Sequence, residues 1–227
     1  MKNISVIIPS AGYGKRMNSQ IPKQLIEIKN EEIIYYTISR FLNDERIKEI
    51  IIPTSEDLKN KIIHICNKFN SSMKFKIILG GEKRQDSVAN GLAVLSSNSE
   101  IVLVHDAVRP FFAENIINDG IELLKKYDGA IAGVPSINTT KIVVNNLVIE
   151  TPKRENLYQI NTPQLFNKKA ILKAYSEAKK INYYGTDDSS LMEKFGGKVA
   201  IILDTYDNIK ITTKRDLYFA KEIIDGN

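Results

Sequence analysis

The residues best suited to chemistry follow the first apolar run of the chain. Residues 10–24 read Ser-Ala-Gly-Tyr-Gly-Lys-Arg-Met-Asn-Ser-Gln-Ile-Pro-Lys-Gln, directly after a buried strand predicted over residues 4–8. Glycines in such a turn let backbone N–H groups approach a phosphate chain closely. Lys15, Arg16 and Lys23 add three positive charges, which suit a triphosphate and the pyrophosphate that leaves it.

This turn matches neither of the two common phosphate-binding motifs. The Gly-x-x-x-x-Gly-Lys-Ser/Thr pattern is absent, and the pair Gly12 and Gly14 lacks the third glycine of the dinucleotide motif. Taken alone, the turn fits a phosphate site or an ordinary glycine turn with solvated charges, and both interpretations stay open at this point.

A second polar segment, residues 80–92, follows a predicted strand and opens a helix. Gly80 and Gly81 permit close approach of the backbone to a flat ligand such as a base. Asp86 or Ser87 then lies in the first helical turn, near free N–H groups. An ordinary strand-to-helix turn gives the same pattern, so this segment alone does not distinguish a base-binding site from such a turn.

A third segment, residues 104–110, follows a very apolar strand. Asp106 at the end of that strand can hold a hard cation such as Mg²⁺, which prefers carboxylate and phosphate oxygens. Arg109 either binds a carboxylate or phosphate with both nitrogens or pairs structurally with Asp106. We interpret His105 as a hydrogen-bonded packing residue rather than a catalytic one.

Two further segments carry polar residues. Thr186 and Asp187 precede a short helix, where either residue serves as an N-cap without any function. Lys210 lies in an otherwise apolar, strand-like run, and we expect it to project into the site. A lysine beside a reacting phosphate stabilises charge that grows in the transition state.

Strands and helices alternate along most of the chain. We predict strands over residues 4–8, 50–53, 76–79, 101–105, 130–134 and 199–203. We predict helices over residues 33–42, 56–69, 86–95, 114–126, 168–179 and 190–195, and a last one after a capping box at 213–216. This alternation favours an α/β fold with a mostly parallel central sheet and helices on both faces, in which ligands bind at the carboxyl ends of the strands.

The alternation breaks between residues 136 and 166. Segments 141–144 and 147–151 flank Asn145 and Asn146, which tolerate positive φ and suit a tight hairpin. We predict an inserted hairpin arm over about residues 136–160. Three interpretations of this arm stay open: a lid, an arm that contacts a second subunit, and a surface hairpin without function. The whole chain, residues 1–227, is otherwise predicted to be one domain.

Composition excludes several classes of protein. A 227-residue chain with 43% hydrophobic and 26% charged residues is ordinary for a globular protein. The net charge of +5 is spread along the chain, which weakly favours anionic ligands and argues against a nucleic-acid partner. One cysteine excludes an internal disulfide, and the apolar runs are too short to span a membrane, so we predict a cytoplasmic protein.

Together the polar segments resemble the 2-C-methyl-D-erythritol 4-phosphate cytidylyltransferase family, among the nucleotidyltransferases with a Rossmann-like, nucleotide-diphospho-sugar transferase type of α/β fold. The resemblance covers nearly the whole chain and rests on segments 11–17, 22–24, 80–88, 105–110, 162–164, 186–187 and 208–212. It implies transfer of a cytidylyl group from CTP to an alditol phosphate with release of pyrophosphate and with Mg²⁺ as cofactor, in isoprenoid precursor synthesis.

The resemblance also implies roles for individual residues. It implies catalytic Arg16, Lys23 and Lys210; nucleotide contacts at Ala11, Gly12, Gly14, Gly81, Ser87 and Asp106; Mg²⁺ near Asp106; and acceptor contacts at Arg109, Thr139, Arg154, Thr186 and Asp187. Thr139 and Arg154 would come from the arm of a partner subunit in a homodimer.

Some residues depart from the family pattern, and other functions therefore stay open. Ser10 replaces a usual Ala, Tyr158 a common Trp, Asn161 a usual Gln, and Asn138 a usual Asp, which puts details of alditol recognition in doubt. The nearest alternative is a ribitol 5-phosphate cytidylyltransferase of teichoic acid or capsule synthesis. A nucleotide-binding protein without catalysis, or a transferase for another base, are further alternatives.

Overall fold

The computed structural model describes residues 2–12 and 21–226, and a seven-stranded sheet forms its centre. The sheet has the order β11-β7-β10-β6-β1-β4-β5. Its strands are β1 (Ile4–Ile7), β4 (Ile47–Thr54), β5 (Lys74–Leu79), β6 (Ile101–Val104), β7 (Gly129–Pro135), β10 (Tyr158–Asn167) and β11 (Val199–Leu203). Neighbouring strands are parallel except at β10, which runs antiparallel to both β6 and β7.

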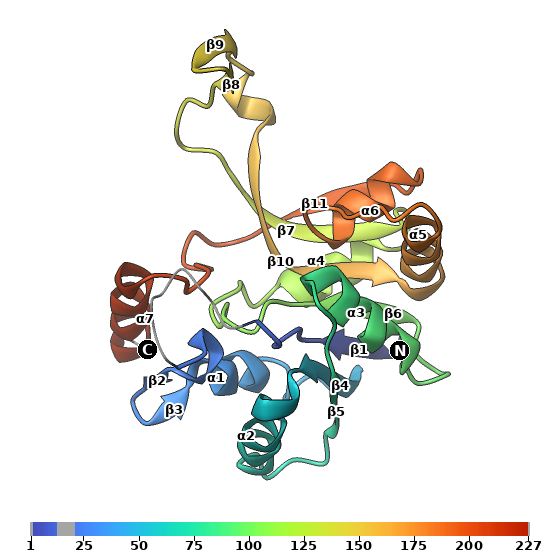
Figure 1. Ribbon diagram of the computed structural model, residues 1–227, viewed down its shortest axis with the longest axis vertical. Coiled ribbons are helices and arrows are strands. Elements are labelled where there is room, and N and C mark those ends of the chain that lie inside the picture. Colours follow the sequence, from blue (N-terminus) through green and yellow to red (C-terminus); the bar gives the residue numbers. More distant parts are fainter. Residues whose placement is uncertain (1, 13–20, 227) are drawn as a thin grey trace.

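Helices cover both faces of this sheet (Figure 1). One face packs against α1 (Ile33–Ser39), α2 (Glu56–Asn67) and α4 (Ile116–Leu123), and the other against α3 (Arg84–Ala93), α5 (Lys168–Lys180) and α6 (Asp188–Lys194). Strand β1 is buried on both faces, since Val6 packs on the first side and Ile7 on the second. This arrangement explains the continuous apolar strands and confirms the predicted fold class.

The remaining elements lie at the edges of this core. A small hairpin of β2 (Glu27–Ile28) and β3 (Glu31–Glu32) packs with the last helix, α7 (Lys214–Gly226), around Ile28, Val108 and Ala220. The predicted capping box forms at the start of α7, where Asp216 N donates to Thr213 Oγ1 at 3.2 Å. In the part of the chain that the structure describes, no helix has the length and apolar character needed to cross a membrane.

Strand β10 is the strand of the central sheet that the sequence pattern does not reveal, and the short β2–β3 hairpin was not predicted either. Polar Asn161, Thr162 and Gln164 interrupt its apolar pattern, and Pro163 removes a backbone donor. The pairing with β7 shifts register between Ile160 and Gln164, which accommodates this irregular stretch. The central sheet is therefore mixed at β10 and parallel elsewhere.

The predicted hairpin arm is present and projects from the body (Figure 1). Its tip pairs β8 (Ile142–Val144) with β9 (Leu147–Glu150) in antiparallel register. Asn145 and Asn146 form the turn with φ values of 50° and 64°, as their tolerance of positive φ predicts. A short 3₁₀ turn, Arg154–Asn156, leads back into β10.

A buried carboxylate ties three strands of the sheet together. Glu49 on β4 is fully buried and accepts hydrogen bonds from Ser5 Oγ at 2.6 Å and Ser96 Oγ at 2.6 Å. Lys76 Nζ lies 2.6 Å from the same carboxylate. Burial alone would raise the pKa of Glu49, but these partners outweigh it and lower the pKa to about 2.

Acid should therefore destabilise the fold partly through Glu49. A carboxylate with a lowered folded-state pKa stabilises the protein above its unfolded value, and this stability is lost as the pH falls from about 4.5 to about 2. We expect Glu49→Gln to lower the free energy of unfolding at pH 7 by about 2 kcal/mol and to flatten its decline below pH 5. Urea unfolding across this pH range measures both effects. Glu122→Gln, at an exposed ion pair, should leave the decline unchanged.

Candidate active site

The carboxyl ends of β1, β5 and β6 meet around one cavity of about 190 Å³. Seven of the residues predicted from sequence line it: Ala11, Gly12, Lys23, Gly81, Ser87, Asp106 and Lys210. Gly14 and Arg16, which were also predicted to bind or act on the nucleotide, lie outside the described residues. The cavity thus brings together segments that are up to about 200 positions apart in the sequence.

Lys23 is placed by the residue that follows it. Gln24 is buried, and its Nε2 donates to Ser10 O at 2.8 Å. Ser10 N in turn donates to Pro53 O at 2.7 Å, which fixes this chain segment beside β4. The 3₁₀ turn Lys23–Leu25 is thereby held against the end of β1, and Lys23 reaches the cavity from it.

The two glycine-containing turns lie in direct contact. A Cβ atom on Gly80 would lie 2.8 Å from Ala11 Cβ, and one on Gly81 would lie 2.3 Å from Asp86 Cβ, so neither position has room for a side chain. Gly81 N donates to Ser87 Oγ at 3.0 Å, and this hydroxyl donates to Lys83 O at 3.2 Å. The backbone of this turn therefore forms a close-packed wall of the cavity.

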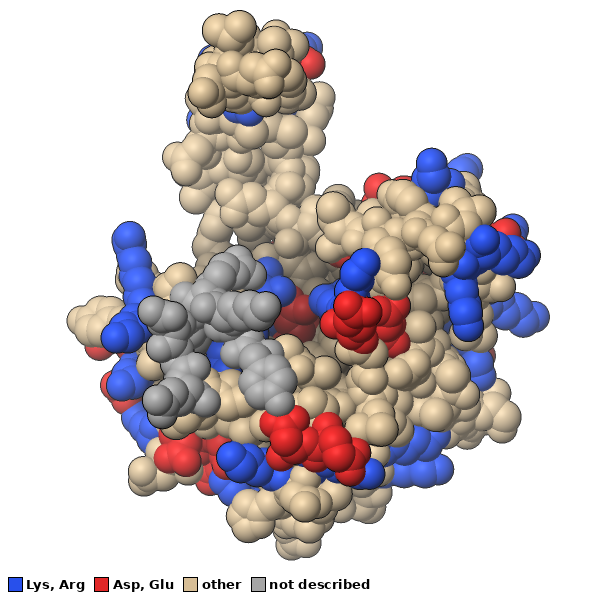
Figure 2. Space-filling view, viewed as in Figure 1, with Lys and Arg blue, Asp and Glu red and all other residues tan. Residues whose placement is uncertain are grey.

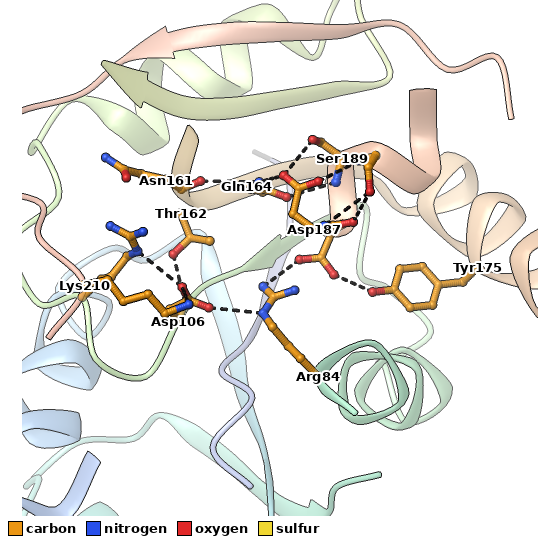
Figure 3. A network of polar contacts seen from close by, with 12 residues as sticks. Arg84, Asp106, Asn161, Thr162, Gln164, Tyr175, Asp187, Ser189 and Lys210 are labelled. Atoms are coloured by element: carbon orange, nitrogen blue, oxygen red, sulfur yellow. Dashed lines mark hydrogen bonds and ion pairs between the residues drawn. The ribbon is translucent and has the colours of Figure 1, made fainter. Parts of the chain in front are cut away.

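Asp106 lies at the centre of a cluster of cations (Figure 3). Its carboxylate is 2.7 Å from Lys210 Nζ, 3.2 Å from Arg84 Nε and 3.3 Å from Arg109 Nε. Arg84 also reaches Asp188, with Nη2 2.8 Å from Oδ2. Because three cations share one carboxylate at this place, the site retains positive charge for an anionic ligand.

The charge of Asp106 is secured by these neighbours. Burial would raise the pKa of Asp106, but Arg84, Lys210 and Arg109 lower it well below its ordinary value. Arg84 keeps its charge in the same way, since Asp188 and Asp106 raise its pKa against the effect of burial. Asp106 and Arg84 are therefore both ionised near neutral pH.

His105 acts as a packing residue, as the sequence analysis favours. Its ring is fully buried in edge-on contact with Phe41 and Phe112. Its Nε2 donates to Arg109 O at 2.8 Å. Burial lowers the pKa of His105 to about 3, so the ring is neutral and supports the backbone after Asp106.

Arg109 and Lys210 are joined through Asn208. Arg109 Nη1 donates to Asn208 O at 2.7 Å, and Arg109 is not among the residues that line the cavity. Buried Asn208 donates through Nδ2 to Asp204 Oδ2 at 2.6 Å and to Thr162 O at 2.8 Å. These contacts hold the segment that carries Lys210 against β10 and aim the lysine at Asp106.

The predicted acceptor residues Thr186 and Asp187 lie beside this cluster, at the start of α6. Thr186 is exposed, whereas the Asp187 carboxylate is the N-cap and accepts from Ser190 N at 2.9 Å. Asp187 Oδ2 also accepts from Gln164 Nε2 at 2.7 Å (Figure 3). Asp187 therefore has a structural role in this chain, which the sequence analysis anticipates as one of its possibilities.

The other two predicted acceptor residues lie on the arm. Thr139 and Arg154 are exposed, and Arg154 Nη1 donates to Ile137 O at 3.3 Å. Neither residue is among those that line the cavity of the same chain.

Comparison with known proteins decides the family. Residues 4–226 match the family model of 2-C-methyl-D-erythritol 4-phosphate cytidylyltransferase. The chain belongs to this family. An enzyme with the family's name from Clostridium botulinum is 44% identical over 226 residues, which cover 99% of both chains. One from Clostridioides difficile is 44% identical over 97% of this chain and 93% of its own.

Solved structures of the cytidylyltransferase family agree. The 4-diphosphocytidyl-2C-methyl-D-erythritol synthase of Anaerococcus prevotii superimposes with a TM-score of 0.88 at 35% identity, covering 99% of this chain and 96% of that one. The 2-C-methyl-D-erythritol 4-phosphate cytidylyltransferase of Francisella tularensis gives a TM-score of 0.82 at 32% identity, covering 97% and 99%.

Family membership confirms the main functional prediction. The chain is a nucleotidyltransferase of the isoprenoid precursor pathway, with CTP as a substrate. The two alternatives, a ribitol 5-phosphate enzyme and an inactive nucleotide-binding protein, are not favoured.

Several polar residues of the site carry no predicted role. Arg84 and Gln164 belong to the network in Figure 3, and Asp188 pairs with Arg84. Gln24 and Asn208 hold the two lysine-bearing segments. Arg84, Gln24, Gln164 and Asn208 all lie inside the segments on which the family resemblance rests, and that position is a signal for them in the sequence. Asp188 lies in none of these segments, and its burial is set by the tertiary fold.

Proposed function

We propose that the cavity around Asp106 is where a cytidylyl group passes from CTP to the phosphate of 2-C-methyl-D-erythritol 4-phosphate. A phosphate oxygen of the acceptor attacks the α-phosphorus of CTP, and the bond from that phosphorus to the pyrophosphate oxygen breaks. The supporting observation is that Lys23 and Lys210, from opposite ends of the chain, line one cavity together with the glycine turn at Gly81.

Positive charge and position are the proposed sources of catalysis. Lys210 would contact the α-phosphate, and Lys23 the phosphates that leave, with Arg16 in the same role. Such cations stabilise negative charge that grows as the new bond forms and the old one breaks. Their prior placement by Asp106 and Gln24 means that little reorganisation is needed during the reaction.

We propose that the nucleoside lies on the wall made by the two turns. The backbone at Ala11, Gly12 and Gly81, with Ser87 nearby, would contact the cytosine, and Gly14 would extend this contact. Asp106 would lie near the ribose. The N–H groups of Gly80 and Gly81 already donate to Thr54 O and Ser87 Oγ, so the C=O groups of this turn are the backbone groups proposed to read the base.

Mg²⁺ is proposed to arrive with the triphosphate. The described residues contain no cluster of three His, Cys, Asp or Glu side chains for a metal, so the protein part of the site supplies few ligands. Mg²⁺ is commonly held by one or two carboxylates together with substrate phosphates and water. Asp106 is the carboxylate nearest to that place, but it already pairs with Arg84, Arg109 and Lys210, so phosphate oxygens and water would supply most ligands of the ion. The ion would add charge neutralisation on the phosphates.

The acceptor is proposed to bind between two subunits. Thr186, Asp187 and Arg109 would contact it from the same chain, and Thr139 and Arg154 from the arm of the partner in a homodimer. The arm carries exposed apolar side chains at Ile142, Val143, Val144, Leu147, Val148 and Ile149, each 45–68% exposed. Figure 2 shows that most of its visible surface lacks charged side chains, unlike the body. Such a surface suits burial against a second copy of the chain.

Arg154→Ala should impair acceptor binding selectively. We expect the acceptor KM to rise about 10- to 100-fold, because a guanidinium–phosphate contact is lost, while the CTP KM changes less than about twofold. Steady-state pyrophosphate release with each substrate varied in turn measures both constants. Lys153→Ala removes a neighbouring exposed positive charge and should leave both constants unchanged. Equal damage to the CTP KM would contradict the role.

Mixing two damaged variants tests whether Arg154 acts in the partner's site. A heterodimer of Arg154→Ala and Lys210→Gln subunits has one site with Lys210 and the partner's intact arm. Random mixing should therefore restore about a quarter of the wild-type activity at low acceptor concentration. No gain on mixing, with mixed dimers present, would mean that Arg154 does not act across the interface.

A cytoplasmic location stays a prediction, which the use of CTP supports.

A further inference from the structure

The first turn of α3 is attached to the segment that precedes α6. Four consecutive residues of that turn, Lys83, Arg84, Gln85 and Asp86, contact residues 183–188. The first of these segments lies between Gly81 and Ser87 of the proposed nucleotide wall, and the second carries the proposed acceptor residues Thr186 and Asp187. A contact between them therefore joins the two halves of the site.

Gln85 forms the centre of this attachment. Its Nε2 donates to Tyr183 O at 3.0 Å, and its Oε1 accepts from Gly185 N at 3.0 Å. Both polar atoms of one amide thus bind the backbone on either side of Tyr184. This backbone belongs to no helix or strand, so the Gln85 side chain replaces the partners that regular structure would supply.

Tyr184 adds a second attachment on the surface. Its hydroxyl donates to Asp86 Oδ1 at 3.0 Å, and Lys83 Nζ lies 3.6 Å from the centre of its ring. Lys83 N donates to Asp86 Oδ2 at 3.0 Å, so the same carboxylate closes the helix start and holds Tyr184. Tyr184 is 46% exposed, which limits the contribution of these contacts relative to those of Gln85.

The segment is also fixed at its far end. Arg84 pairs with Asp188 at the first position of α6, and Tyr175 from α5 donates to the other oxygen of Asp188 (Figure 3). At Gly185 a Cβ atom would lie 2.3 Å from Ser190 Oγ, so the loop is pressed against α6 as well. Residues 186 and 187 lie between the Gln85 contact and the Arg84 contact.

We propose that Gln85 is a positioning residue for the acceptor, which sets the distance between the segment 183–187 and the nucleotide-binding turn. This inference rests on the proposed acceptor site at Thr186 and Asp187. Without the Gln85 contacts, the loop would have to be ordered when the acceptor binds. The conformational entropy lost in ordering the loop would then weaken acceptor binding. The nucleotide wall itself is closed by Ser87 and would stay formed.

The test is a set of point variants assayed by pyrophosphate release. We expect Gln85→Ala to raise the acceptor KM about tenfold, as for the loss of two ordinary hydrogen bonds, with a CTP KM within about twofold of wild type. Gln85→Met keeps the length of the side chain and should show the same increase if the hydrogen bonds are responsible. Asn90→Ala is the matched control, since it removes a side-chain bond from the same helix to Leu79 O, away from the acceptor segment.

Each outcome bears on the proposal. A raised acceptor KM in both Gln85 variants, with an unchanged melting temperature, supports it. An unchanged acceptor KM in both variants overturns it, and so does a CTP KM that rises as much as the acceptor KM. An acceptor KM that rises in Gln85→Ala but not in Gln85→Met also overturns it. Thr186→Val in the same series tests the underlying site. If Thr186→Val raises the acceptor KM and the Gln85 variants do not, the proposed role of Gln85 is wrong but the acceptor site stands. If neither Thr186→Val nor the Gln85 variants raise the acceptor KM, both the acceptor site and the role of Gln85 are wrong.

Discussion

Lys210→Gln should lower kcat by about 10²- to 10³-fold, the usual loss when one preorganised charge-stabilising group is removed. Lys210 Nζ lies 2.7 Å from Asp106 and lines the cavity together with Lys23. Its charge stabilises the transition state, in which negative charge is redistributed at the α-phosphorus, more than it stabilises bound CTP. The kcat should therefore fall by a larger factor than the CTP KM rises. Pyrophosphate release at saturating concentrations of both substrates measures the effect.

The control for this variant is Lys214→Gln, which removes the same charge from an exposed position four residues further on. Its kcat should match that of the wild type. If Lys210→Gln retained wild-type turnover, Lys210 would have no part in the chemical step. If only the CTP KM changed, its role would be uniform binding of the nucleotide.

Asp106→Asn should damage both stability and activity. Asp106 is 8% exposed, and its carboxylate is shared by Arg84, Arg109 and Lys210. Removing it leaves three partly buried cations facing one another, so we expect the free energy of unfolding to fall by about 3 kcal/mol. We also expect kcat to fall by at least about 10²-fold, because Lys210 loses the partner that positions it.

Urea unfolding and pyrophosphate release on the same preparation separate the two effects of Asp106→Asn. Asp207→Asn, at an exposed position in the Lys210 segment, should change neither. Unchanged stability in Asp106→Asn would show that the three cations do not depend on this carboxylate. Full activity would remove Asp106 from the proposed positioning of Lys210.

Local patterns in the sequence predict most of the sheet and the place of the site. The apolar runs at β1, β4, β5, β6, β7 and β11 are each recognisable alone, and parallel strands bring their carboxyl ends to one edge. Ala11, Gly81 and Asp106 each follow such a strand, so their meeting in one cavity could be expected. Strand β10 is not predictable in this way, because its proline and polar residues hide the pattern of a strand that pairs on both sides.

Contacts between distant segments could not be predicted in this way. Gln85 and Gly185 are 100 positions apart, and nothing in either segment indicates the other. Asp188 is buried and paired with Arg84, although its sequence neighbours are typical of an exposed helix start. The roles of these residues follow from the packing of α3 against α6, which depends on the whole fold rather than on local pattern.

The most direct test of the proposed reaction is the rate of pyrophosphate release with CTP and Mg²⁺, with 2-C-methyl-D-erythritol 4-phosphate and ribitol 5-phosphate offered in parallel. We predict a kcat/KM at least about 100-fold higher for the first acceptor, because a site built for one set of acceptor groups rejects another that leaves its polar groups unsatisfied. A preference for ribitol 5-phosphate would contradict the proposed acceptor site at Thr186 and Asp187 and the function built on it.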